Sequence, residues 1–183
     1  TDSRNSRNPA PNRLNRDFVA TEPNQKWVAD VTYIPTRQGW LYLATVLDLF
    51  SRKIVGWSMA RRLESRLAQR ALLNAIQARK PRAGLMVHTD QGAEYYAANY
   101  QSILKEHGFI SSMSRKGDCY DNAVMESFFH SLKVEELHHQ QFDTRDEAQA
   151  AVFEYIEMFY NRQRLHSSIG YVSPVEFEER SVA

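Results

Sequence analysis

The stretch from residue 26 to residue 60 constrains the fold more than any other part of the chain. It contains three apolar segments with the residue types of β-strands, in direct succession: KWVADVTYIPT, WLYLATVLDLF and KIVGWSMA. Only short polar connections separate them, around Thr36–Gly39 and at Ser51–Arg52. Because connections this short join antiparallel neighbours, we expect three hairpin-linked strands at the start of the fold.

After residue 60 the apolar spacing changes to that of a helix. Apolar side chains recur at helical spacing over residues 63–76, and Pro81 follows shortly after them. The run LMVH then predicts a short buried strand. We expect one helix from about residue 93 to residue 106, and another short strand over residues 109–112.

Two further helices complete the pattern. The first carries NAVMESFFHSLKVEEL, and we expect Asp121 to cap its start. The second begins at Thr144, which has the spacing of a capping box with Glu147. The order β-β-β-α-β-α-β-α-α predicts an α/β fold with a mixed five-stranded sheet flanked by helices, which is the ribonuclease-H-like arrangement.

Length and composition limit the other possibilities. The 183 residues suit one domain, and residues 1–25, rich in Asn, Arg and Pro, predict an arm or linker before a core of residues 26–183 that ends in a helical tail. The lone Cys119 excludes an internal disulfide framework and a multi-cysteine zinc site. No apolar run approaches the ~20 residues of a membrane span, and no signal peptide is present, so we expect a cytoplasmic protein without a membrane partner.

The net charge of +1 hides a strong segregation of charge. Residues 51–82 hold nine Lys and Arg against one Glu, whereas residues 134–160 hold seven acids against one Arg. A local basic field can attract a polyanion even when the whole chain is nearly neutral. The alternative is two ordinary solvated helix faces.

Three carboxylates stand in apolar surroundings, where an ionised group is costly. Asp30 lies in the middle of KWVADVTYI, Asp90 follows the buried strand LMVH, and Glu126 lies on an otherwise apolar helix. Hard oxygen ligands from separate elements can hold Mg²⁺. Spacing alone leaves the choice of ligands open, because the following acids compete: Asp48, Asp118 and Asp121.

A resemblance decides among them. Asp30, Asp90 and Glu126, with 35 residues between the second and third acids, resemble the DDE triad of retroviral integrases and bacterial insertion-sequence transposases. Five ordered blocks resemble one group in particular, the second reading frame of insertion-sequence family three. They are NQKWVADVTYI, GWLYLATVLDLFSRKIVGW, HTDQGAEY, SRKGDCYDNAVMESFFHSLKVE and FYNRQRLHSSIGYVSP.

The resemblance implies a role for each matching residue. Asp30, Asp90 and Glu126 become catalytic ligands of two Mg²⁺ ions, with Mn²⁺ as a substitute. Lys133 lies seven residues, or about two turns, beyond Glu126, and is expected to contact a DNA phosphate.

Further DNA contacts are expected from two other segments. One is the polar loop before the Glu126 helix, with Arg115, Lys116 and Asn122. The other is the terminal block, with Arg162, Arg164 and His166, although packing of its aromatic residues inside the domain is an equal alternative.

The implied activity is that of a transposase catalytic core. It cleaves a phosphodiester at the element's end and transfers the resulting 3′-hydroxyl to target DNA, and we expect a homo-oligomer on DNA, associated with the nucleoid. Two alternatives remain: a ribonuclease-H-like nuclease that only hydrolyses, and a repurposed, non-enzymatic DNA-binding or oligomerisation module. Because this family carries DNA-binding helices upstream, we also expect a shortened chain or partial reading frame.

Overall fold

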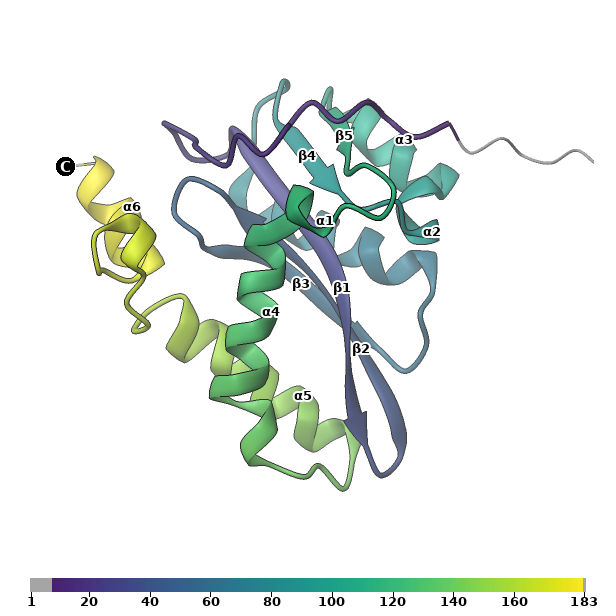
Figure 1. Ribbon diagram of the computed structural model, residues 1–183, viewed down its shortest axis with the longest axis vertical. Helices are drawn as coiled ribbons and strands as arrows, with labels where there is room; N and C mark the ends of the chain where they lie inside the picture. Colours follow the sequence, from purple (N-terminus) through teal and green to yellow (C-terminus); the bar gives the residue numbers. More distant parts are fainter. Residues whose placement is uncertain (1–7, 183) are drawn as a thin grey trace, which may run out of the picture.

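The computed structural model describes residues 8–182 and contains the expected mixed sheet (Figure 1). In chain order, its strands are β1 Lys26–Thr36, β2 Gly39–Asp48, β3 Ile54–Ala60, β4 Met86–Thr89 and β5 Ile110–Met113. The spatial order is β3-β2-β1-β4-β5. The first three strands pair antiparallel, whereas β4 pairs parallel to both β1 and β5. The predicted fold class is therefore confirmed.

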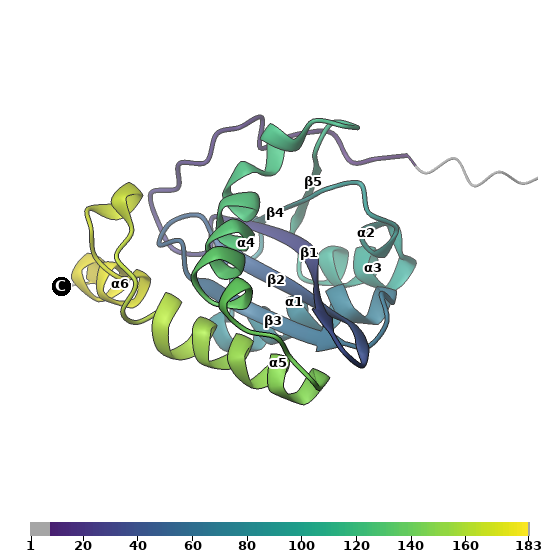
Figure 2. The same ribbon diagram turned by 60° about the horizontal axis from the view of Figure 1, so that its bottom comes forward.

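Helices cover both faces of this sheet (Figure 2). One layer consists of α1 Ser65–Arg79, α2 Ala93–Tyr96 and α3 Ala98–Glu106. The other consists of α4 Ala123–Glu135 and α5 Arg145–Phe153, which continues as a π-helix through Glu154–Tyr160. A final helix, α6 Pro174–Val182, ends the described chain.

Alternation along β1 explains why both faces are covered. Trp27 and Ala29 pack into the cluster under α1 and α3, whereas Val28 and Ile34 pack into the cluster under α4 and α5. Successive strand residues point to opposite faces, so this apolar strand is buried from both sides. An acid in its middle is thereby held next to α4.

Two local predictions are wrong, and one is confirmed. The single helix expected over residues 93–106 is split at Ala97, whose extended backbone (φ −55°, ψ 132°) ends α2 before α3 begins. Asp121 does not cap α4, because Asn122 occupies the cap position and makes no side-chain cap bond. The capping box of Thr144 and Glu147 is present at the start of α5.

Asp121 instead accepts hydrogen bonds from the segment that precedes β1. Its carboxylate accepts hydrogen bonds from Asn12 Nδ2 at 2.8 Å, from Arg16 Nε at 3.0 Å and from the Arg115 amide at 2.9 Å. Leu14, which is 1% exposed, is buried in the same segment. These long-range contacts have no local sequence signal, which is why the capping prediction failed.

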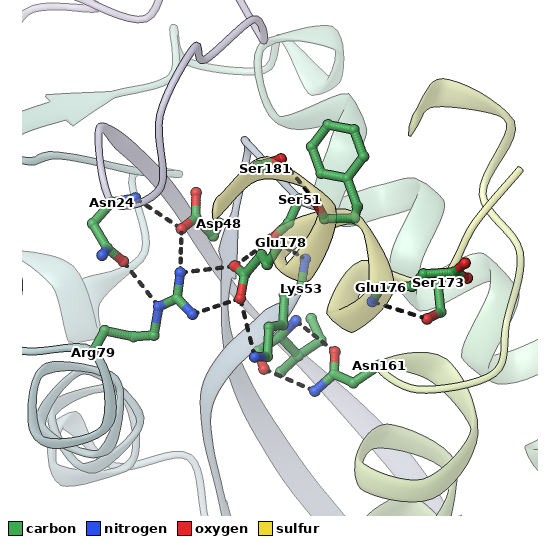
Figure 3. A network of polar contacts seen from close by, with 12 residues as sticks. Asn24, Asp48, Ser51, Lys53, Arg79, Asn161, Ser173, Glu176, Glu178 and Ser181 are labelled. Atoms are coloured by element: carbon green, nitrogen blue, oxygen red, sulfur yellow. Dashed lines mark hydrogen bonds and ion pairs between the residues drawn. The ribbon is translucent and has the colours of Figure 1, made fainter. Parts of the chain in front are cut away.

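A polar network fixes α6 against the β2–β3 turn (Figure 3). Arg79 of α1 donates to both carboxylate oxygens of Glu178, at 2.7 and 2.8 Å, and also contacts Asp48 at 3.3 Å. Ser51 and Lys53 donate to the same glutamate. The terminal helix therefore packs on the domain. Within residues 8–182, no helix is both long and apolar enough to cross a membrane.

Candidate active site

Asp30, Asp90 and Glu126 line one hollow of about 450 Å³. Asp30 lies in the middle of β1, Asp90 directly follows β4, and Glu126 lies in the first turn of α4. Because β1 and β4 are parallel neighbours and α4 packs over β1, the topology brings three distant residues to one place. The other lining residues come from two loops, Gln91–Gly92 and Ser114–Asp118, and from Asn122.

The electrostatics of Asp30 reflect these neighbours. Burial, followed by the negative charges of Asp90, Glu94 and Glu126, raises the pKa of Asp30 to about 7, against a hydrogen bond from the Val31 amide. Burial also raises the pKa of Asp90, whose Oδ1 accepts from the Gly92 amide at 2.8 Å. Carboxylates that disfavour one another's ionisation this way favour a bound cation.

Glu94 is a fourth acid that sequence reasoning missed. It lies on the short helix α2, and burial followed by the charge of Asp90 raises its pKa. A Cβ at Gly92 would come within 2.8 Å of the Glu94 carboxylate and 2.9 Å of Asp90 Oδ1, so the absent side chain leaves room for both acids. The only sequence signal is that Glu94 follows Asp90 by four residues.

The donors at this hollow suit a hard divalent cation. Each of the facing acids offers carboxylate oxygens, the ligands that Mg²⁺ prefers. Across residues 8–182, no group of three or more His, Cys, Asp or Glu side chains is already arranged to hold a metal ion. The three acids nevertheless suit a divalent cation, because they offer oxygen ligands and because a bound cation would relieve the repulsion between their charges.

The competing acids are engaged elsewhere to different degrees. Asp48 is fully buried and pairs with Arg79 and the Asn24 amide, and Asp121 pairs with Arg16. Asp118 lines the hollow, but its Oδ2 lies 2.5 Å from Arg16 Nη2.

Three of the residues expected to contact DNA lie at the same hollow. Arg115 and Lys116 are exposed there, and Asn122 lies at its edge with both side-chain polar atoms buried and without hydrogen bonds. Lys133 occupies a neighbouring hollow, with its Nζ 5.8 Å from the centre of the Tyr33 ring.

The expected residues of the terminal block lie away from the three acids. Arg162 donates to the Glu157 carbonyl, and Arg164 forms an ion pair with Glu135 at 2.7 Å. His166 is buried, with its ring edge-on to Tyr160 at 4.7 Å. Arg164 and His166 instead line a second hollow beside α4.

Two models of the integrase core domain match this chain, over residues 20–119 and 126–182. The chain belongs to the integrase core domain family. The transposase for insertion sequence element IS904 of Lactococcus lactis is 52% identical over 92% of this chain and 67% of its own length. Transposase InsF for insertion sequence IS3A of Escherichia coli is 52% identical over 94% of this chain and 60% of its own length. The expected resemblance to insertion-sequence transposases is confirmed, and this integrase core spans about two thirds of these relatives.

Solved structures confirm the fold. The catalytic core domain of BIV integrase matches 87% of this chain and 96% of its own with a TM-score of 0.64 at 17% identity. The HTLV-2 integrase catalytic core domain in complex with magnesium matches 87% of this chain and 99% of its own, with a TM-score of 0.62 at 17% identity. A simian T-cell lymphotropic virus intasome covers 93% of this chain and 58% of its own, with a TM-score of 0.73 at 16% identity.

Proposed function

We propose that this integrase core cleaves DNA at the ends of an insertion sequence and joins the freed 3′-hydroxyl to target DNA. One observation carries the proposal: Asp30, Asp90 and Glu126, from three separate elements, line a single hollow. The transposase relatives support the reaction class.

The three acids are proposed to hold two Mg²⁺ ions, or Mn²⁺ in their place. The bound ions would supply an activated oxygen nucleophile and charge stabilisation at the leaving oxygen of a phosphodiester. The protein's own part is to fix the ligands. The Val31 amide orients the Asp30 carboxylate at 2.8 Å, and the Gly92 amide orients Asp90 at the same distance.

The surroundings of the acids are proposed to position the DNA. Arg115 and Lys116 lie at the mouth of the hollow, where their charges can hold backbone phosphates. The unpartnered amide of Asn122 is available to a phosphate or a water inside the hollow. Lys133 lies about 10 Å farther along α4, a distance that reaches a neighbouring nucleotide.

Strand transfer by this arrangement needs no covalent enzyme intermediate. Water attacks the phosphodiester first, and the released 3′-hydroxyl then attacks a second phosphodiester and displaces its 3′-oxygen. Both DNA segments must be held at once, so we propose that copies of the chain assemble on DNA.

The test is an assay of cleavage and strand transfer on oligonucleotides with the element's end sequence, in Mg²⁺ and in Mn²⁺. We expect Asp90→Asn to reduce both products by at least about 100-fold, because it removes an anionic ligand. The matched control is Asp143→Asn, an exposed aspartate in the segment before α5 whose only ion pair in the described chain is with Arg37. Equal rates for Asp90→Asn and wild type would contradict the proposal, and hydrolysis without joined product would favour the nuclease alternative.

A further inference from the structure

A second hollow, of about 340 Å³, lies beside α4 and is independent of the three acids. At 3.6 residues per turn, Ser127 and Ser131 lie about 100° and about 140° around α4 from Glu126, on another flank of the helix. The hollow lies between this flank, the β2–β3 turn and the segment after the π-helix. We call it the Arg52 pocket; its lining comprises Phe18, Arg52, Ala123, Val124, Ser127, Phe128, Ser131, Tyr160, Arg164, His166, Ser167 and Ser168.

The lining of the Arg52 pocket is rich in hydrogen-bond donors. It contains two guanidinium groups, one imidazole and four serine hydroxyls, and no carboxylate. Arg164 is fixed in place, since Glu135 accepts from both its Nε and its Nη2, at 2.8 and 2.7 Å. Its Nη2 also reaches Ser131 Oγ at 3.3 Å. The pocket is thus built from oriented donors before any ligand arrives.

Arg52 is the decisive residue. Its side chain makes no hydrogen bond or ion pair with any residue in the described part of the chain, and its Nη1 is buried without a partner. Burial lowers the pKa of Arg52, and the nearby Tyr160 side chain offsets this only in part. A guanidinium that is partly removed from water without a counter-ion is costly, so an external anion would account for this position.

His166 adds a second unsatisfied group at the same place. The residue is 8% exposed, and its Nε2 makes no hydrogen bond. Its Nδ1 lies 3.5 Å from Arg164 Nη1, which ties the ring to the guanidinium. Two buried nitrogen atoms on residues of one pocket therefore lack partners.

We propose that the Arg52 pocket binds a phosphate-class oxyanion, and that on DNA this anion is a backbone phosphodiester. Guanidinium forks bind phosphate oxygens in pairs, and hydroxyl groups can donate to the remaining oxygens. Because α4 contributes residues both to the Arg52 pocket and to the hollow of the three acids, one DNA molecule that crosses this helix can contact both. The assignment to DNA rests on the proposed function, whereas the anion site does not.

The first experiment uses inorganic phosphate and the whole 183-residue chain, with chloride at equal ionic strength as the blank. Binding is followed through the NMR signals of the His166 ring and by the rise in melting temperature. We expect saturable binding that is at least tenfold weaker in Arg52→Gln. The matched control, Arg62→Gln, removes the same charge from an exposed arginine outside the pocket and should bind like wild type.

Folding is controlled in two ways. Arg52→Gln removes a charge that has no partner in the described chain, so we expect a melting temperature equal to or above that of wild type without phosphate. Arg52→Lys keeps the charge but loses the paired N–H donors of the guanidinium group, and we expect it to bind phosphate with intermediate affinity. Absence of saturable binding by the wild-type chain, or equal binding by Arg52→Gln and Arg62→Gln, would overturn the proposal.

The second experiment titrates a DNA duplex at several salt concentrations. We expect Arg52→Gln to weaken binding about fivefold more than Arg62→Gln, and to reduce the salt slope by about one. If phosphate binding depends on Arg52 but DNA binding does not, the pocket takes free phosphate and the DNA assignment is overturned. If the chain cleaves DNA but does not bind phosphate, only the proposal of the Arg52 pocket is contradicted. If the chain binds phosphate but does not cleave DNA, only the proposed function is contradicted.

Discussion

Replacing Asp30 with asparagine should stabilise the metal-free protein at pH 8. Asp30 lies in a mostly buried position, and burial together with the charges of Asp90, Glu94 and Glu126 raises its pKa to about 7. The unfolded chain releases the same proton near its ordinary value of about 3.9. Between these two values the folded state holds a proton that the unfolded state has lost, so stability falls as pH rises through this window.

The size of the effect follows from that difference. Three pKa units correspond to about 4 kcal/mol when both forms have titrated fully, at 1.36 kcal/mol per unit. Because the hollow is open to water and ions, we expect about 2–4 kcal/mol of added stability in Asp30→Asn at pH 8. Asparagine keeps the shape and an oxygen for the Val31 amide while removing the charge.

The assay is urea unfolding in EDTA from pH 4 to pH 8. The difference in the free energy of unfolding between Asp30→Asn and wild type should be small at pH 4 and grow until about pH 7. Glu22→Gln, at an exposed position, should show no such pH dependence. Saturating Mg²⁺ at pH 8 should stabilise wild type and shrink the advantage of the variant, since only wild type retains the full set of ligands.

Two results would contradict this role for the charge of Asp30. One is an Asp30→Asn variant that is no more stable than wild type at pH 8 without metal. The other is an advantage of the same size at pH 4 and pH 8, which would show that the charge of Asp30 is not its source.

Three further predictions concern other parts of the domain. Glu135→Gln, which weakens the ion pair with Arg164, should cost about 1 kcal/mol in urea unfolding, and an unchanged midpoint would contradict the contact. Gly56→Ala should cost about 3 kcal/mol or more, because its Cβ would lie 2.4 Å from the Ala71 carbonyl oxygen of α1; a melting temperature within 1–2 °C of wild type would show that the helix can move away. Lys133→Ala should leave the fold intact but weaken DNA binding and lower its salt slope by about one, and an unchanged slope would remove this lysine from the interface.

Sequence patterns predicted most of the fold because the strands in its first half pair with their neighbours in the sequence. The strands before residue 60 are joined by short connections, and an apolar strand with one central acid identifies Asp30 as exceptional. The acids themselves were recognisable only through the ordered blocks around them, since Asp48, Asp118 and Asp121 look equally plausible in isolation.

The remaining features depend on contacts between distant residues. Glu94 looks like a surface residue of a helix until the structure places it beside Asp90. Asp121 looks like a cap, but its partners Asn12 and Arg16 lie more than 100 residues away. The lining of the Arg52 pocket combines a turn after β2 with a segment more than 100 residues later, so no periodic pattern in the sequence could predict the pocket.

The position at which a divalent ion binds tests the metal-ligand assignment of the three acids directly. Crystals of the chain soaked in Mn²⁺ would locate the ion by its anomalous scattering. We expect Mn²⁺ in the hollow, with carboxylate oxygens of Asp30, Asp90 and Glu126 as ligands, and loss of that signal in Asp90→Asn. Mn²⁺ bound elsewhere, or an empty hollow at saturating Mn²⁺, would contradict the assignment of these three acids as the metal-binding centre.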